Sequence, residues 1–361
     1  MKKSKYFIGS VGSVLFLSLP AISQAVELAG EKLELYGKAH MSLDFSDPDA
    51  SGEESQTSVS NNSTRIGFKG KHDIDTGPTL LWQYEQGVDI ADGGGEFASR
   101  NSFLGLKGAL GEVRVGHHDT PSKKLGSRWG MFSDTVGDRR ATLGAYSGAP
   151  GEYGNVLNDR ADNALLYINQ FDALELQAMY SASNPTQSTS GGLDDNDFDL
   201  ASASLTYETR QLMIGAAVEH WSLDPVNGAE EVDNLRLAAS YTMNNFKVGA
   251  IYESTDSEDS VFERDAYGLN AAYRFTDATD LRLQYIVADD NEDQSASGAS
   301  QLAVGLHNQL DEATQVYAAF STTDNDANAV YQGIDGGHGD ELETEPGGSP
   351  SSFSVGAVYA F

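Results

Sequence analysis

The last ten residues of the chain, Ser352-Phe-Ser-Val-Gly-Ala-Val-Tyr-Ala-Phe361, alternate between two kinds of side chain. Successive side chains of an extended strand point to opposite sides, so every second residue shares a face. One face is apolar and tipped with aromatic rings, and it carries Phe353, Val355, Ala357, Tyr359 and Phe361. The other face carries small side chains. This pattern is typical of a strand in the wall of a membrane barrel.

The opposite end of the chain predicts export. Three lysines occur within the first five residues, followed by the apolar stretch Tyr6–Ile22 and then by Ser23-Gln24-Ala25. A basic start, an apolar stretch and a small-x-Ala ending predict a secretory signal peptide over residues 1–25. The alternative is an N-terminal membrane helix, but no stop-transfer charges follow. We therefore expect residues 26–361 to form the mature protein, as a single transmembrane β-barrel domain.

Composition narrows the class of protein. After residue 25 the sequence has no run of about 18 apolar residues, which excludes a bundle of membrane-spanning helices. It has no cysteine, so disulfides do not stabilise it. The formal net charge is -31, and without the signal peptide 20 basic residues face 54 acidic ones. Nucleic acid is therefore not an expected partner.

Segments of about ten residues alternate apolar and polar side chains from Glu31 onward, as strands of a membrane barrel do. Seven short turns alternate with eight long polar connections. This arrangement predicts an all-β fold, an antiparallel transmembrane barrel of 16 strands with an aqueous lumen. The alternative is a soluble sandwich or propeller, which the strict alternation of long and short connections disfavours.

The longest connection, residues 120–160, mixes basic and acidic residues. A connection of this length is seldom without a role, so we expect this third long loop to fold into the lumen and to narrow it as a constriction loop. The alternative is a surface loop whose charges are merely solvated.

Several basic side chains occupy inward-facing positions on the strands before this loop. Alternation directs four of them into the lumen: Lys38, Arg65, Arg100 and Arg114. Opposite Asp134 and Asp138 on an inserted loop, they would create a transverse electric field across a constriction. The alternative is that each is a rim charge near the lipid headgroups.

The outer connections are acidic. Residues 324–350 contain seven aspartates and glutamates but no lysine or arginine. A negative outer mouth attracts cations at low ionic strength, so we expect weak cation selectivity. The alternative is that these carboxylates serve only to solvate the surface.

Short motifs in a characteristic order cover the mature chain. They are Leu35-Tyr-Gly-Lys38, Thr64-Arg-Ile-Gly-Phe-Lys-Gly70, Ser99-Arg-Asn-Ser-Phe-Leu-Gly-Leu-Lys-Gly108, Val113-Arg-Val-Gly116, Asp159-Arg160 before Asn163-Ala-Leu-Leu-Tyr167, and Tyr359-Ala-Phe361. In this order they resemble the general diffusion porins of Gram-negative outer membranes.

The resemblance implies a homotrimer of sixteen-stranded barrels in the outer-membrane lipid, with the third long loop folded inward. It also implies a basic arc of Lys38, Arg65, Arg100 and Arg160 facing Asp134 and Asp138. Tyr359 and Phe361 would be the signal that the barrel-assembly machinery reads.

Sequence motifs for catalysis are absent. The chain has no nucleophile elbow, metalloprotease helix or nucleotide-binding loop. We therefore expect no catalytic, cofactor-binding or metal-ligating residues and no enzymatic activity. The predicted function is a water-filled channel for passive diffusion of small hydrophilic solutes and ions. The alternatives are a substrate-specific sugar or anion channel, an outer-membrane barrel enzyme, or an adhesin.

Overall fold

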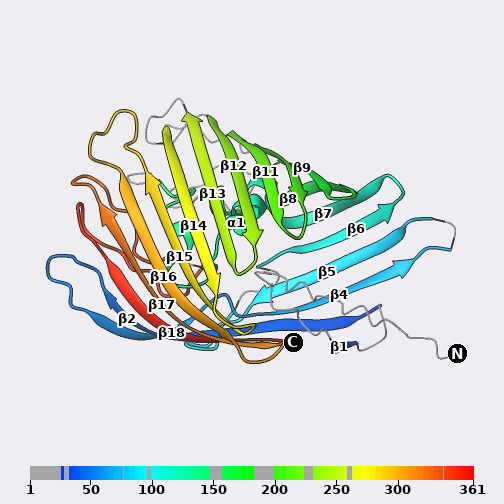
Figure 1. Cartoon of the computed structure of the whole chain (residues 1–361). Coiled ribbons are helices and arrows are strands. Elements are labelled where there is room, and N and C mark those ends of the chain that lie inside the picture. Colours follow the sequence, from blue (N-terminus) through cyan, green and yellow to red (C-terminus); the bar gives the residue numbers. More distant parts are fainter. Residues whose placement is uncertain are drawn as a thin grey trace, which may run out of the picture.

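The computed structural model describes residues 26–27, 32–75, 77–95, 99–146, 157–182, 199–222, 231–257, 262–335 and 337–361. The predicted signal peptide, residues 1–25, therefore lies outside the described residues. Most of the described chain is strand, and the strands form one curved wall (Figure 1).

Antiparallel strands follow one another in chain order around this wall. They are β1 (Val26–Glu27), β2 (Glu34–Asp47), β3 (Gln56–Asn61), β4 (Arg65–Asp73), β5 (Thr79–Gly87), β6 (Ser102–Gly108), β7 (Gly111–Asp119), β8 (Arg160–Phe171), β9 (Leu174–Ala182), β10 (Asp199–Glu208), β11 (Leu212–Ser222), β12 (Glu231–Met243), β13 (Phe246–Ser257), β14 (Arg264–Arg274), β15 (Thr279–Ala288), β16 (Ala299–Gln309), β17 (Thr314–Asn325) and β18 (Ser351–Ala360).

The sheet closes on itself, because β18 pairs with β2 and β9 pairs with β10. Two rows of the wall are each made of two pieces. Strands β3 and β4 pair with β2 one after the other. Strand β1 continues the row of β18, since β18 ends at the pair Ala360↔Lys38 and β1 begins at Val26↔Leu35. The described strands therefore form a closed barrel of sixteen rows, which confirms the predicted fold class.

Short hairpins join the strands at one end of the barrel. Asp172 and Asn244 stand in two of these turns with φ of 52° and 53°, in the left-handed region. Asp and Asn tolerate that region better than other side chains, and such turns match the twist of paired strands. The sequence thus fixes the register at this end, while the long connections occupy the other.

The two faces of each strand differ as predicted. On β18, Phe353 and Tyr359 are 43% and 51% exposed on the outside of the barrel, whereas Ser352 and Ser354 are buried on the inside. This inversion of a soluble protein's pattern suits a wall that faces lipid.

Helix α1 (Pro121–Trp129) follows β7 and lies on the inner side of the wall (Figure 1). The Thr120 side chain caps the helix by accepting a hydrogen bond from the Lys123 backbone N–H. Pro121 occupies the first turn, where no backbone donor is needed. A short 3-10 helix, η1 (Arg139–Ala141), follows. In the part of the chain described, no helix is both long enough and apolar enough to cross a membrane.

Apolar packing lies between this inner segment and the wall, not at the centre of the barrel. Leu125, Trp129 and Phe132 are almost fully buried against residues of β11 to β17. We call residues 120–146 the inner segment, and its position is fixed by this core.

Candidate functional site: the inner segment and the basic wall

Wall side chains donate hydrogen bonds to backbone carbonyls of the inner segment. Arg236 on β12 bonds the Ser122 carbonyl at 2.9 Å, and Asn270 on β14 bonds the Trp129 carbonyl at 2.8 Å. On β15, the Gln284 amide bonds the carbonyl of Gly137 at 3.0 Å. Each is an inward-facing polar residue of the alternating pattern. Together they hold the inner segment along the wall.

A fully buried charge cluster strengthens this attachment. The Glu253 carboxylate on β13 lies 3.0 Å from Arg236 Nε and 3.5 Å from Arg264 Nη2. It also accepts a hydrogen bond of 2.8 Å from the Gly144 backbone N–H. Arg264 in turn donates to the Thr142 carbonyl at 3.0 Å. Glu253 thus serves as the counter-charge of two buried arginines, and the cluster binds the inner segment and the wall at once.

An open cavity of about 1470 Å³ lies between the inner segment and the facing wall. The seven residues predicted to form a constriction all line it: Lys38, Arg65, Arg100, Arg114, Asp134, Asp138 and Arg160. Arg100 was expected on a strand but lies just before β6, which begins at Ser102. Residues 147–156 of the predicted constriction loop lie outside the described residues.

We call Lys38, Arg65, Arg100, Arg114 and Arg160, on the barrel side of the cavity, the basic wall. Asp134 does not face this wall across an opening, which corrects the expected separation of charges. Its Oδ2 lies 2.6 Å from Lys38 Nζ and 4.0 Å from Arg65 Nη1. Burial alone would raise the pKa of Asp134, but Lys38, Arg140 and Arg65 outweigh burial and hold that pKa well below its usual range. A carboxylate withdrawn from water needs such partners, so Asp134 joins the inner segment to the wall.

Asp138 organises the inner segment internally. Its Oδ2 accepts a hydrogen bond of 2.7 Å from the Asp134 backbone N–H and lies 2.8 Å from Arg140 Nη2. Its side chain is almost fully buried. The charge of Asp138 is therefore balanced within the loop.

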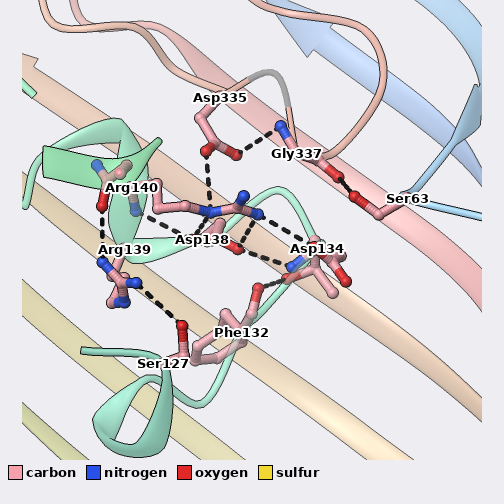
Figure 2. A network of polar contacts seen from close by, with 12 residues as sticks. Ser63, Ser127, Phe132, Asp134, Asp138, Arg139, Arg140, Asp335 and Gly337 are labelled. Atoms are coloured by element: carbon pink, nitrogen blue, oxygen red, sulfur yellow. Dashed lines mark hydrogen bonds and ion pairs between the residues drawn. The ribbon is translucent and has the colours of Figure 1, made fainter. Parts of the chain in front are cut away.

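The last long loop reaches the inner segment. Asp335, between β17 and β18, places Oδ2 at 3.2 Å from Arg140 Nε (Figure 2). Its Oδ1 also accepts a bond from the Gly337 N–H at 3.2 Å, and the Gly337 carbonyl accepts one from the Ser63 hydroxyl at 2.9 Å. Burial raises the pKa of Asp335 to about 6, against the opposing effect of Arg140. The two loops and the wall beside β4 thus share one polar network.

Beside the cavity, pairs of cations share single carboxylates. Glu85 on β5 lies 2.7 Å from Arg100 Nε and 3.9 Å from Arg65 Nε. Asp119 lies 3.0 Å from Lys123 Nζ and 3.1 Å from Arg160 Nε. Glu112 is likewise shared, between Arg114 and Lys107, whose Nζ lies 3.8 Å from Glu112 Oε2. Each shared carboxylate leaves an excess of positive charge beside the cavity.

Comparison with known proteins identifies the family. A model described as Gram-negative porin matches residues 12–328. The chain belongs to the Gram-negative porin family. Outer membrane protein U of Vibrio vulnificus is 28% identical over 271 residues, which cover 72% of this porin and 70% of that protein. Major outer membrane protein P.IB of Neisseria gonorrhoeae is 31% identical over 135 residues, or 34% of this porin. The porin spans only 38% of the length of that relative.

Solved structures show the same fold. The anion-selective porin from Comamonas acidovorans superposes with a TM-score of 0.76 at 22% identity, covering 91% of this porin and 99% of that chain. The trimer form of OmpT from Vibrio cholerae gives a TM-score of 0.66 at 18% identity, covering 91% and 99%. The porin is therefore a transmembrane β-barrel of the outer membrane.

The charge of the cavity is opposite to that of the whole porin. Of the described residues that line it, fourteen are lysine or arginine and nine are aspartate or glutamate. The formal excess is five positive charges, although the chain as a whole carries -31. Within the described residues, no group of three or more His, Cys, Asp or Glu side chains is arranged to hold a metal ion.

Sequence reasoning did not single out several residues that complete the site. Glu85 could have been found, because it faces inward on β5 two residues from Gln83 in the same alternating phase. Arg140 and Asp335 could not, since their contact joins two loops distant in sequence that follow no periodic pattern.

Proposed function

We propose that this porin is a passive, water-filled outer-membrane channel for small hydrophilic solutes and ions. Its narrowest part is the space between the inner segment and the basic wall. The observation that supports this proposal is the contact of loop residue Asp134 with wall residues Lys38 and Arg65, all three of which line the cavity. A loop held against a barrel wall in this way restricts the size of what passes.

We also propose that the constriction favours anions. The cations on its wall outnumber the carboxylates, and Glu85 and Asp119 are each shared between two cations. Charges in a narrow, low-dielectric passage act on a permeating ion more strongly than charges at an open mouth.

The weak cation selectivity expected from the whole-chain charge then becomes an effect of the outer loops alone. Exposed charges are screened within about 8 Å at physiological ionic strength. The acidic loops therefore matter most at low salt, and the constriction dominates at high salt.

The porin family and the barrel fold support a channel without catalysis. OmpT of Vibrio cholerae, which shares this fold, has a trimer form, and we propose a homotrimer embedded in outer-membrane lipid here. Tyr359 and Phe361, at the end of the last strand, remain our candidates for the signal to the barrel-assembly machinery.

Single-channel recording tests the proposal. The mature, refolded porin would be inserted into a planar lipid bilayer and the reversal potential measured across a tenfold potassium chloride gradient, at low and at high mean concentration. A reversal potential of the anion-selective sign at high salt, shifting toward the cation-selective sign at low salt, supports it. Cation preference at both concentrations rejects the anion-selective constriction, and a folded, inserted but silent protein rejects the channel.

A second candidate is a channel specific for one class of anion. The excess of cations beside the cavity favours it over a sugar channel. A specific channel saturates as the anion concentration rises, whereas a general one conducts in proportion to it. Conductance in chloride and in a dicarboxylate such as succinate separates the two.

A further inference from the structure

Three wall glycines lie directly beneath the buried apolar side chains of the inner segment. A β-carbon added at Gly215 on β11 would lie 2.4 Å from Leu125 Cδ1. One added at Gly268 on β14 would lie 2.7 Å from Trp129 Cη2, and one at Gly305 on β16 would lie 2.8 Å from Phe132 Cε1. Real side chains do not approach so closely. A side chain at Gly268 or Gly305 would therefore collide with a buried aromatic ring, and one at Gly215 would force Leu125 to move.

Backbone conformation does not explain these glycines. None of Gly215, Gly268 and Gly305 has a positive φ, so other residues could adopt the same extended backbone. Glycine weakens a strand, because it restricts the chain least and offers no side chain for packing. The requirement at these sites is therefore space for a close approach.

The side chains above the three glycines fill that space completely. Trp129 has no exposed surface, and Leu125 and Phe132 are each 1% exposed. A fourth wall glycine, Gly249 on β13, also lies beside the Trp129 indole, with a β-carbon position 3.1 Å from Trp129 Nε1. We call Gly215, Gly249, Gly268 and Gly305 the glycine seats.

Polar contacts hold the inner segment close to the glycine seats. The Trp129 carbonyl accepts its hydrogen bond from Asn270, two residues along β14 from Gly268. Five residues beyond Trp129, the Asp134 side chain contacts Lys38 on β2. The position of Trp129 against the wall therefore determines whether Asp134 can contact Lys38.

We propose that the glycine seats are positioning residues that determine the width and charge of the constriction. They act through the inner segment, because they allow Leu125, Trp129 and Phe132 to pack directly against the backbone of the wall strands. This inference rests on the proposed function only where it concerns ion flow; the position of the loop is a separate property.

Gly268→Val tests the seat under the largest side chain. Its β-carbon would meet a buried indole ring rather than the end of a flexible side chain, so the inner segment must move off the wall. The partner variant Trp129→Ala removes the indole ring. In the double variant, the space left by the ring accommodates the valine side chain added at residue 268. A mutual rescue of this kind identifies a specific contact.

Two readouts follow the loop and the current separately. A water-soluble carbodiimide joins an amine and a carboxylate that are in direct contact, and mass spectrometry of the digested protein would measure the Lys38–Asp134 cross-link. Single-channel conductance and reversal potential would be recorded on the same preparations. Gly87→Val is the matched control, because among the described residues a β-carbon added there would meet Ser99 Oγ, at an ordinary distance of 3.5 Å.

The expected result is loss of the Lys38–Asp134 cross-link and an altered conductance in Gly268→Val, with both returning toward wild type in the double variant. Gly87→Val should behave as wild type. A Gly268→Val porin with wild-type cross-linking overturns the inference, as does a defect that Trp129→Ala fails to relieve. If Gly268→Val does not fold, Gly268→Ala makes the same comparison with a smaller intrusion.

Failure of the channel proposal would look different. A wild-type protein that cross-links Lys38 to Asp134 but passes no current would reject the channel. In that protein, the cross-linking series would still decide whether the glycine seats position the loop.

Discussion

Arg140 Nε lies 3.2 Å from Asp335 Oδ2, and this contact ties the third long loop to the last one inside the barrel. Arg140 also contacts Asp134 at 3.1 Å and Asp138 at 2.8 Å, so one guanidinium serves three carboxylates (Figure 2). The neighbouring Asp138 and Asp134 carboxylates favour protonation of Asp335, whereas Arg140 opposes it. Burial selects Asp335, whose pKa it raises to about 6.

Acidification from pH 7 to pH 5 should therefore shift selectivity toward anions. With a pKa of about 6 for Asp335, roughly a tenth of these carboxyls are protonated at pH 7 and roughly nine tenths at pH 5. Each protonation removes a negative charge beside Arg140. The folded-state pKa lies above the ordinary value, so the contribution of this group to stability is greatest at low pH and declines as pH rises through about 6. The shift should thus occur without unfolding.

Reversal potentials recorded from pH 7 to pH 5 check this prediction, with Asp335→Asn as the comparison. The variant lacks the titrating carboxyl and should show a smaller change over that range. An equal change in both proteins would assign the titration to groups other than Asp335.

Removing the wall arginines should enlarge the channel and shift its selectivity toward cations. Arg65→Ala and Arg100→Ala each delete a cation beside the cavity and leave Glu85 less neutralised. The expected result is a higher single-channel conductance and a reversal potential shifted toward cation selectivity. Arg210→Ala removes an exposed arginine that does not line the cavity, and it serves as the control. Currents equal to wild type in both wall variants would remove these residues from the constriction.

Neutralising Glu253 should destabilise the porin. Glu253→Gln keeps the shape of the side chain but leaves Arg236 and Arg264 buried without a counter-charge. Breaking a buried ion pair from one side costs about 3–5 kcal/mol. The free energy of unfolding in lipid vesicles, measured by urea titration, should fall by that order. Glu231→Gln, at the exposed first residue of β12, should change it by less than about 0.5 kcal/mol.

Phe361→Ala should reduce assembly in cells more than stability in vitro. The Phe361 backbone exchanges hydrogen bonds of 2.8 and 3.0 Å with Gly37, and the substitution leaves these intact. The lost ring stacks on Tyr359 at 6.0 Å between centroids, a modest contact. Outer-membrane levels in cells, compared with the refolding yield of purified protein, measure the two effects. Normal levels in cells would remove Phe361 from the assembly signal.

The barrel was predictable from sequence because its pattern is local and repeated. Alternation of period two placed Ser352 and Ser354 inside and Phe353 outside, and the structure confirms each. Lipid outside and water inside impose that pattern on every strand, so each strand reports the fold independently.

The site was less predictable because its contacts join parts distant in sequence. Alternation directed Lys38 and Arg65 inward, but it did not indicate that Asp134 would contact them directly. Helix α1 was also not predicted, although Thr120-Pro121 is a typical helix start. A loop adopts the conformation that its surroundings fix, and here the surroundings are glycines and polar side chains on strands far along the chain.

The pairing of β18 with β2 has a consequence for biogenesis. Phe361, just after β18, bonds Gly37 near the start of the first long strand, so this seam cannot close until β18 has been delivered. Until then both strand edges present unpaired amides and carbonyls that invite association with other chains. Closure between the two ends of a sequence is also the slowest kind of contact to form. A product that lacks β18 would therefore stay open-edged and become a substrate for degradation instead of a finished pore.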